Sequence, residues 1–525
     1  MNQSTTHPQY RRGASVVLAV LALMFVSRYL PSPRAVFVAD DWFNYARSSF
    51  YATHGDAVRT ALTDPNRPLS MAAVEIVYRV FGDRSGLWTA LSLVSHSLMI
   101  LCVMLMGWEL TRSWRTAAIQ GVLLVLLPNL TETWHWSTQI LNQVTCAMLP
   151  YALSGWMGVA YVRRGGAWRA ALSAVAYAVG LFSYEQGILL PAAGLTLLSD
   201  RRELRRVLTG LAPMGVIAVL YAAWRVTNSF GLNTFWGYPP QMTASASWTL
   251  PLWNLRQIMH WWMGDNLFGA WLDGLRGFAM LAPWTRRLLV MLGVAMLAAA
   301  GALLKRRAGE EEATDRAGVP PVRAAAFGLL WAAAAYTVCL IAYVDSRLNI
   351  LPAFGLTLAL AVGLNRWPIR QWGPVLFLPA LLAMAANQGT TESFRQVGVF
   401  DRRIYQHLQQ TQPEWKDQAA VLVDTRALRQ RLTRGLLAPI GAEVHTWALY
   451  QNALLLRSMV PRGMVWRLVG EWNPPLLVVH DVENGARIEG DRLVWHDRGA
   501  PDVVHDAPLD RVYVLDVWAA AVGSK

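Results

Sequence analysis

Two adjacent carboxylates, Asp40 and Asp41, follow directly on the first hydrophobic stretch of the chain. Acidic side chains at a boundary between membrane and water are costly unless they are solvated, paired or used in chemistry. Neighbouring carboxylates raise one another's pKa, so one use of this acid pair is a general base that deprotonates an acceptor hydroxyl. Another is a cation site, since oxygen ligands suit Mg²⁺, Mn²⁺ or Ca²⁺. An aspartate that only caps a following helix is the structural alternative.

Two short polar turns between apolar stretches offer further candidate side chains. Glu132 and His135 are three residues apart and share a face if the segment is helical, although a lone Glu–His pair is not a zinc motif. Tyr184 and Glu185 lie between two apolar stretches with little loop around them, and an acid so placed is a candidate functional group. For both turns a solvated loop or a structural hydrogen-bond network is the alternative.

Two arginines, Arg67 and Arg347, lie in turns where the surrounding pattern is otherwise poor in basic residues. A guanidinium group binds phosphate oxygens in a bidentate manner, so either arginine is a candidate ligand for a lipid phosphate. The alternative for Arg347 is a local ion pair with Asp345. The sequence contains no glycine-rich phosphate loop, no GxSxG and no HExxH.

The elements that would hold these residues are membrane spans. Of the 525 residues, 54% are hydrophobic and 15% are charged, whereas soluble domains carry about 25% charged residues. Apolar stretches of roughly 17–25 residues recur, which is long enough to cross a bilayer. We expect a mostly α polytopic membrane protein with about eleven transmembrane helices. Their approximate limits are 13–31, 86–110, 115–130, 139–162, 170–184, 186–199, 206–225, 286–304, 324–343, 349–364 and 372–388.

The charge of the connections alternates along the chain. Basic residues gather in every second connection, which the positive-inside rule places in the cytoplasm together with the N-terminus. The acid pair and the turns at Glu132 and Glu185 fall in the opposite set, as does the C-terminal segment, and are therefore expected outside. The first span, preceded by Arg11 and Arg12, is expected to stay uncleaved.

Two long outer loops and a C-terminal region complete the predicted organisation. The first loop, 32–85, is expected to contain amphipathic helices on the membrane over 41–52 and 68–82. The second, 226–285, is rich in tryptophan, typical of an interfacial belt or of stacking on sugars or lipid chains. We divide the chain into a transmembrane domain, 1–390, and an extracytoplasmic α/β domain, 391–525. In the latter we expect strands at 419–423, 476–479 and 511–517, a helix at 445–459 and a hairpin turn at 488–493.

The remaining composition excludes other classes. The net charge of +13 arises from short loops between spans, with no basic helix typical of nucleic-acid binding, so no nucleic-acid partner is expected. The three cysteines, Cys102, Cys146 and Cys339, fall within hydrophobic stretches, which argues against a disulfide framework or a metal–thiolate site.

Taken in order, these motifs resemble the GT-C superfamily of membrane glycosyltransferases, and in particular its protein O-mannosyltransferase and aminoarabinose-transferase branch. The matching elements, over roughly the first 390 residues, are the acid pair, the Arg67-Pro68-Leu69 turn, residues 88–96, 128–136 with Glu132, 182–191 with Tyr184-Glu185-Gln186-Gly187, and 347–352 with Arg347. In that branch Glu is common at the second acid position, where this chain has Asp41.

The resemblance implies inverting transfer of a sugar from a polyprenyl-phosphate donor to a hydroxyl of a protein or polysaccharide acceptor. It implies Asp40 as the base, and Arg67, Glu132, His135, Tyr184, Glu185 and Arg347 as substrate-binding candidates. It places the protein in a bacterial inner membrane with its C-terminus in the periplasm and membrane lipids around it. No cofactor is certain, although a divalent cation at the acid pair stays possible.

Three other functions stay open. An O-antigen ligase or polymerase also uses lipid-linked glycans, but its key loop usually comes late in the chain. A lipid or sugar transporter (flippase) favours inverted repeats around a midplane site, and no such repeat is visible here. A scaffold for envelope polysaccharide assembly would tolerate the loss of both Asp40 and Asp41.

Overall fold

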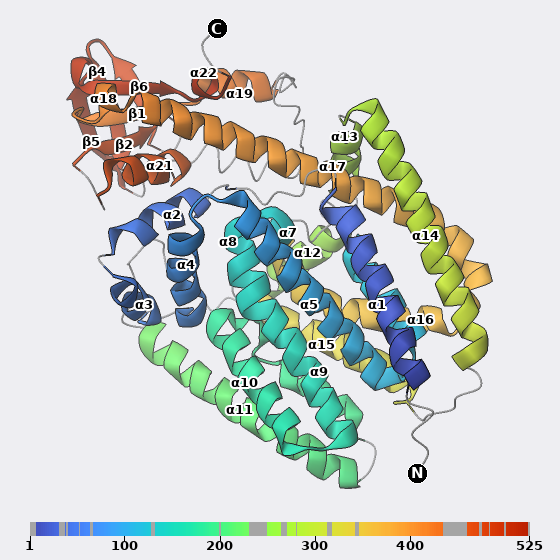
Figure 1. Ribbon diagram of the computed structural model, residues 1–525. Coiled ribbons are helices and arrows are strands. Elements are labelled where there is room, and N and C mark those ends of the chain that lie inside the picture. Colours follow the sequence, from blue (N-terminus) through green and yellow to red (C-terminus); the bar gives the residue numbers. More distant parts are fainter. Residues whose placement is uncertain are drawn as a thin grey trace.

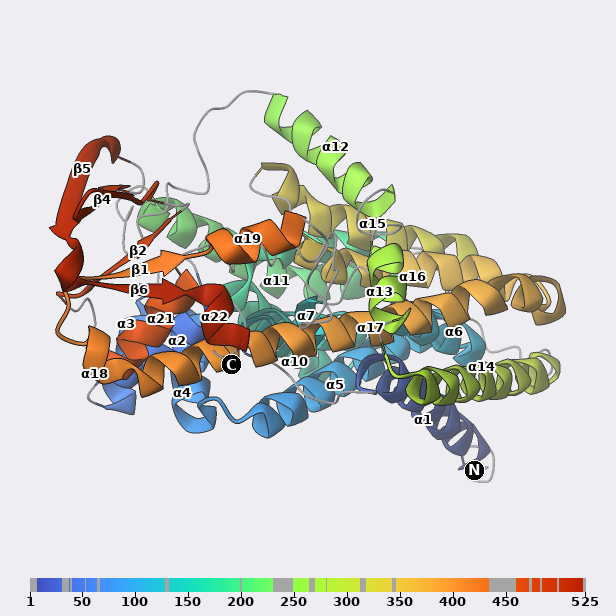
Figure 2. The same ribbon diagram turned by 90° about the horizontal axis from the view of Figure 1, so that it is seen from above.

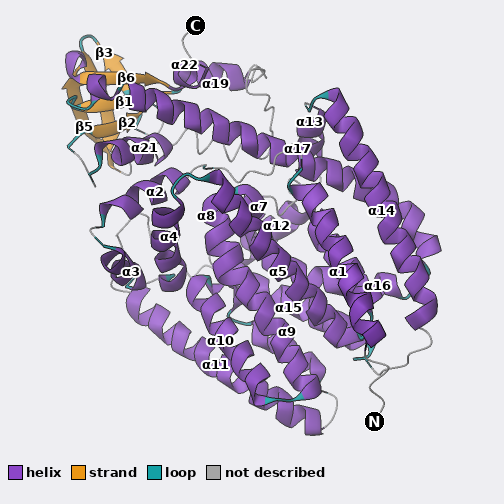
Figure 3. Cartoon of the chain, viewed as in Figure 1, coloured by secondary structure: helices purple, strands orange, loops and turns teal. Residues whose placement is uncertain are grey.

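The computed structural model is mostly helical, and its strands gather in one corner of the molecule (Figure 3). The structure describes residues 7–30, 37, 40–51, 53–63, 67–127, 132–198, 201–229, 249–263, 270–279, 281–311, 318–341, 346–433, 459–471, 475–481, 484–497 and 500–522. The expectation of a mostly α chain with a small C-terminal α/β region is thereby confirmed.

The predicted spans correspond to a bundle of apolar helices (Figure 1). These helices are α1 (His7–Arg28), α5 (Ser85–Thr111), α6 (Trp114–Leu126), α9 (Leu149–Arg164), α10 (Ala167–Ser183), α11 (Arg201–Ser229), α14 (Pro283–Glu311), α15 (Pro321–Ile341) and α16 (Ile350–Asn365). Within the described residues, segments of α5, α11, α14 and α15 are long and apolar enough to cross a membrane, and segments of α1, α6, α10 and α16 are apolar but shorter. The chain is therefore a multi-pass membrane protein.

Two predicted spans are not simple α-helices. The fourth, 139–162, begins with a short turn, α8 (Ser137–Gln139), and a π-helix, η3 (Ile140–Met148), before it continues as α9. The sixth, 186–199, contains the 3₁₀-helices η4 (Glu185–Gly187) and η5 (Leu190–Leu197), with Pro191 in the first turn of η5. Wide or tight helical turns of this kind are frequent at functional sites.

Connections predicted to be cytoplasmic meet at one end of the bundle. The carbonyl of Leu110 accepts hydrogen bonds from the Val319 N–H (2.7 Å) and from Arg163 (3.4 Å). Arg115 donates to the carbonyl of Trp367 at 2.8 Å. The helix that begins with the acid pair lies at the opposite end, beside the C-terminal strands (Figure 1).

The first long loop forms three helices rather than the two that the sequence predicted. Helices α2 (Asp40–Phe50) and α4 (Pro68–Phe81) fall within the predicted ranges. Between them lies α3 (His54–Leu62), whose N-cap Thr53 accepts a hydrogen bond from the Asp56 N–H at 3.1 Å. Trp42 and Ala46 of α2 are buried, and α2 packs on α4 and on the C-terminal helix α21 (Met459–Val469). The apolar face of α2 is therefore covered by protein and not by lipid.

One long helix joins the bundle to the C-terminal region. Helix α17 (Ile369–Gln410) includes the last predicted span and continues without a break through the predicted domain boundary at 390. In the second long loop, α12 (Thr249–Met263) and α13 (Ala270–Ala279) are described, and α13 packs on α17. Gly274 and Gly389 make this close approach possible, because a Cβ on Gly389 would lie 1.8 Å from the Gly274 carbonyl oxygen.

The C-terminal unit, residues 412–522, has two small sheets (Figure 2). Its elements are α18 (Gln412–Trp415), β1 (Ala420–Asp424), α19 (Arg426–Thr433), α21, β2 (Leu477–His480), β3 (Arg487–Glu489), β4 (Arg492–Asp497), β5 (Ala500–Pro508), η8 (Leu509–Arg511), β6 (Val512–Asp516) and α22 (Val517–Val522). One sheet is parallel in the order β2-β1-β6, and the other is antiparallel in the order β3-β4-β5. The three predicted strands and the hairpin are confirmed; the predicted helix 445–459 lies outside the described residues except for residue 459, where α21 begins.

A single hydrophobic cluster joins the first loop to the C-terminal unit. It contains Trp42, Tyr78 and Trp88 from the first part of the chain and Trp415 and Met464 from the last. Burial of such large side chains stabilises a protein by about 2–3 kcal/mol each. The C-terminal unit is therefore held firmly against the helices that carry the acid pair.

Candidate functional site

Asp41 lies at the centre of a buried hydrogen-bond cluster, which we call the Asp41 cluster and which also contains Tyr78 and Thr138. The carboxylate is fully buried. Its Oδ1 accepts hydrogen bonds from the Thr138 N–H (2.8 Å), the Thr138 hydroxyl (2.5 Å) and the Tyr78 hydroxyl (2.5 Å). Thr138 belongs to α8, directly before the π-helix η3, and both its backbone N–H and its hydroxyl group reach Asp41 on α2. A carboxylate held in this way is fixed in place and does not face solvent.

A second acid, Asp401, approaches the Asp41 cluster from α17. It lies beyond the predicted span in that helix and is 1% exposed. The pKa of the Asp401 carboxyl is raised well above its usual range, mainly by burial and secondly by the negative charge of Asp41. The indole of Trp42 acts in the opposite direction.

An ion pair lies on the same two helices as the Asp41 cluster. Arg47 of α2 pairs with Glu75 of α4, and both side chains are almost fully buried. Burial raises the pKa of Glu75, and the charge of Arg47 partly offsets that rise. This pair fixes α2 across α4, which is the geometry that brings Asp41 to Tyr78.

A second polar cluster, the Arg67 cluster, contains Arg67, Tyr184 and Glu185. Arg67, the N-cap of α4, contacts Glu185 through two hydrogen bonds of 3.2 and 3.0 Å. Its guanidinium group also lies 3.9 Å from the centre of the Tyr184 ring. Burial alone would raise the pKa of Glu185, but the charges of Arg67 and of Arg225 lower it to about 2. The structure thus brings Arg67 to Tyr184 and Glu185, which belong to a different predicted turn.

The turn that carries Arg347 lies beside the Arg67 cluster. This turn is the 3₁₀-helix η7 (Ser346–Asn349). Gln186, the residue after Glu185, is buried and donates to the carbonyl of Leu348 at 2.5 Å. The backbone that carries Arg347 is therefore close to Glu185, although the Arg347 side chain and Asp345 lie outside the described residues.

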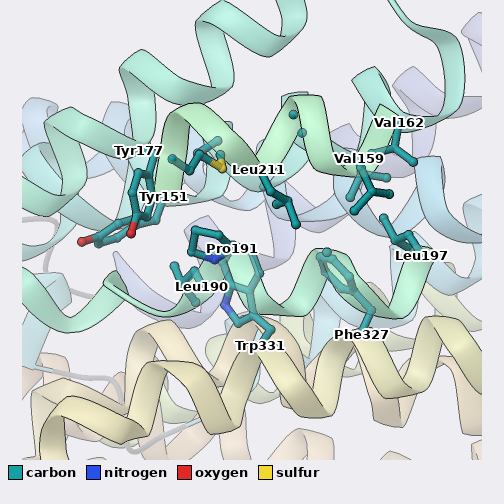
Figure 4. A pocket seen from close by; sticks show the side chains of 17 residues that line it. Tyr151, Val159, Val162, Tyr177, Leu190, Pro191, Leu197, Leu211, Phe327 and Trp331 are labelled. Atoms are coloured by element: carbon teal, nitrogen blue, oxygen red, sulfur yellow. The ribbon is translucent and has the colours of Figure 1, made fainter. Parts of the chain in front are cut away.

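An apolar pocket lies inside the helix bundle (Figure 4). It has a cavity volume of about 50 Å³ and lies between α9, α10, η5, α11 and α15, with Leu190, Leu211 and Phe327 among its lining residues. Two tyrosines of the lining reach the turn that contains Glu185. The Tyr151 hydroxyl donates to the carbonyl of Tyr184 and the Tyr177 hydroxyl to the carbonyl of Ile188, both at 2.6 Å. The lining of this apolar pocket thus contacts the backbone of the turn that carries Glu185.

His135 is buried in a different set of contacts. It ends the short helix α7 (Glu132–His135), and its Nε2 lies 3.0 Å from the Thr391 hydroxyl. Burial, with the positive charge of Arg28 as the second cause, lowers the pKa of His135 to about 3, so the imidazole is neutral. Arg28 in turn donates to the carbonyl of Val125 at 3.1 Å. These contacts join the ends of α1, α6 and α17; the side chain of Glu132 lies outside the described residues.

Some of these residues were missed at the sequence level. Tyr78 and Thr138 lie in segments of ordinary composition, and only the fold brings them to Asp41. Asp401 and Arg28 carried a visible signal, since each is a charged residue within or close to an apolar helical pattern. The side chain of Asp40 lies outside the described residues, so its role as base stays a prediction.

The described side chains do not form a site for a divalent cation. Among them, no group of three or more His, Cys, Asp or Glu residues is close enough to bind a metal. The Oδ1 atom of Asp41 already accepts three hydrogen bonds, which disfavours its use as a metal ligand. No step of the mechanism below depends on a metal.

The site and the bundle together define a multi-pass, mostly helical membrane protein in which Asp41, Glu75 and Asp401 are buried near the C-terminal unit. No protein-family model and no curated protein sequence matches the chain.

Among solved structures, the chain is structurally similar over most of its length to ArnT from Cupriavidus metallidurans. The crystal structure of ArnT bound to undecaprenyl phosphate has 16% sequence identity and a TM-score of 0.36, and the match covers 89% of this chain and 77% of that one. The apo structure has 16% identity and a TM-score of 0.33, with 78% and 81% covered.

Proposed function

We propose that this chain is an inverting glycosyltransferase that moves a sugar from a polyprenyl-phosphate donor to a hydroxyl group on the extracytoplasmic face of the membrane. The observation that carries the proposal is the contact between an apolar pocket and the turn of the Arg67 cluster, which Tyr151 and Tyr177 of the pocket make. A lipid phosphate needs both features next to each other, an apolar groove for its chain and a cationic end for its head group. The acid pair supplies the remaining requirement, a base.

Two positive side chains act on Glu185. Arg67 pairs with its carboxylate, and the charge of Arg225 also lowers its pKa. Arg347 lies in the neighbouring turn. In the proposed mechanism, Arg67 or Arg347 contacts the donor phosphate and stabilises the charge that develops on it as it leaves.

In this reaction Asp40 takes the proton of the acceptor hydroxyl as its oxygen attacks the anomeric carbon. The bond from that carbon to the phosphate oxygen breaks on the opposite face, and its electron pair leaves with the lipid phosphate. No general acid is needed, because a phosphate is a good leaving group; glycoside hydrolysis, in contrast, usually needs two carboxyl groups. Asp41, fixed by Tyr78 and Thr138, positions the start of α2.

The direct test uses the full chain in lipid nanodiscs with a panel of labelled polyprenyl-phosphate sugars and acceptors, with and without chelator. The variant Asp40→Asn is expected to lose transfer by about 100-fold or more while donor binding changes little. Asp56→Asn, an exposed acid on α3, is the matched control and is expected to keep full activity. Full transfer by a correctly inserted Asp40→Asn protein would refute the assignment of the base.

The sidedness is tested separately by thiol labelling in intact cells. Ser49→Cys on α2 is expected to react with a membrane-impermeant maleimide, whereas Ala167→Cys, at the opposite end of the bundle, is expected to react only after lysis. Both native residues are exposed. Protection of Ser49→Cys in intact cells would place the acid pair in the cytoplasm and exclude an externally facing donor.

A further inference from the structure

Asp401 is a buried acid that the mechanism above does not use. It lies on α17 one turn before Tyr405, so the two side chains share a helix face. The ring of Tyr405 lies 4.8 Å from the ring of Trp42 on α2, which shows that this face of α17 packs on the helix that begins with the acid pair. The Oδ1 atom of Asp401 is buried and has no hydrogen-bond partner among the residues that the structure describes.

Two of the arginines on the helices around Asp401 already have partners. The titratable and charged side chains of these helices include Asp41, Arg47 and Tyr45 on α2, Glu75, Tyr78 and Arg79 on α4, Arg402, Arg403 and Tyr405 on α17, and Arg462 and Arg467 on α21. Arg47 is paired with Glu75, and Arg467 donates to the hydroxyl of Tyr45 at 3.2 Å. Helix α22, which also packs on α17, has no titratable side chain.

Helix α21 of the C-terminal unit packs closely on α2. Gly463 of α21 lies so close to α2 that a Cβ there would be 2.7 Å from the Phe43 backbone nitrogen. This contact and the Trp42–Tyr405 contact hold α2 between α21 and α17, which restricts the movement of Asp41 away from Asp401. Two buried carboxylates held near each other titrate as a pair, and the second ionisation is strongly disfavoured.

We propose that Asp401 is a positioning residue that keeps a proton beside Asp41, so that the buried acids at the start of α2 carry one negative charge and not two. The effect on catalysis rests on the proposed function, because it acts through the orientation of Asp40. The proton stays on Asp401 throughout the reaction, while the acceptor proton passes to Asp40 and then to water.

The first test detects the proton without any activity measurement. A protonated buried carboxyl group gives a carbonyl stretching band, separate from the amide bands, in the infrared spectrum. The full chain at neutral pH, in an alkyl glycoside detergent that has no ester carbonyl, is expected to show this band, and Asp401→Asn is expected to lose it, while Asp83→Asn, an exposed acid, keeps it. In Asp41→Asn the band is expected to disappear at a lower pH than in the native protein, because the neighbouring negative charge is gone. A spectrum that Asp401→Asn leaves unchanged would overturn the proposal.

The second test follows transfer as a function of pH. In the native protein, activity is expected to fall at alkaline pH as Asp401 ionises and repels Asp41. Asp401→Asn imitates the protonated acid and cannot ionise. The ratio of its activity at alkaline pH to its activity at neutral pH is therefore expected to exceed the same ratio in the native protein by about tenfold, which corresponds to a pH about one unit above the pKa of Asp401. A purely structural role of Asp401 predicts the same pH profile for both proteins. If the native chain transfers no sugar at all, the proposed function fails, while the infrared band still decides where the proton is.

Discussion

The hydrogen bonds to Asp41 make a graded prediction about stability. In Asp41→Asn an amide oxygen can still accept from the two Thr138 donors and from Tyr78, so only the charge assistance is lost. Charge-assisted hydrogen bonds are roughly twice as strong as neutral ones, and the expected loss is about 2 kcal/mol. In Asp41→Ala the same donors lose their acceptor within a buried site.

The hydroxyl groups in the cluster can partly compensate in Asp41→Ala. The Tyr78 and Thr138 hydroxyl oxygens are 2.7 Å apart, so one can donate to the other. The Thr138 N–H and one hydroxyl hydrogen then remain buried without an acceptor. At 1–3 kcal/mol for each unsatisfied group, the expected loss is about 4 kcal/mol.

The measurement is thermal unfolding of the full chain in detergent, followed by intrinsic fluorescence of its 25 tryptophans. The expected order of melting temperature is native, then Asp41→Asn, then Asp41→Ala, with Asp56→Asn as an exposed control close to native. The double variant Tyr78→Phe with Thr138→Val is expected to lose less than the sum of the single variants, because both hydroxyls serve one oxygen atom. Equal melting of Asp41→Asn and Asp41→Ala would refute the view that Asp41 is a fixed acceptor.

Three further predictions concern the surrounding elements. The folded pKa of Glu185 is lowered from 4.5 to about 2, so its pairing with Arg67 stabilises the protein above about pH 4.5, and this stabilisation is lost as the pH falls toward 2. Glu185→Gln should therefore make the melting temperature depend less on pH in the acidic range. An unchanged acidic range of the pH–melting curve would contradict this. Gly463→Ala should lower the melting temperature, because the added Cβ would clash with the backbone of α2 even though alanine favours helices. Gly215→Ala, where a Cβ would meet open space, should not lower it. Equal effects of the two variants would exclude a tight contact between α21 and α2. Leu211→Trp should fill part of the apolar pocket and raise the KM for a polyprenyl-phosphate sugar several-fold at similar melting temperature, and an unchanged KM would place the lipid chain elsewhere.

The sequence predicted some residues of the candidate site but not their contacts. The sequence named Arg67 in one turn and Tyr184 with Glu185 in another, and the fold brings the two turns into one cluster. It named Asp41 as part of the acid pair, but the partners Tyr78 and Thr138 could not be foreseen, since they come from helices far apart in the chain. For the C-terminal region, alternation of apolar residues was enough to predict strands β1, β2 and β6, whereas their order in the sheet was not predictable.

What the sequence determines by itself is the local and one-dimensional part of this protein: apolar stretches long enough to span a bilayer, basic residues in alternate connections, and acids at the end of the first span. These depend on the transfer free energy of each segment, which sums over neighbouring residues. The tertiary structure alone decides which side chains meet, that Asp41 is buried beneath Tyr78, that Asp401 approaches it from α17, and that the C-terminal unit packs on α2. These contacts depend on the close packing of helices distant in sequence, where approaches such as the one at Gly463 are set by the shapes of both partners.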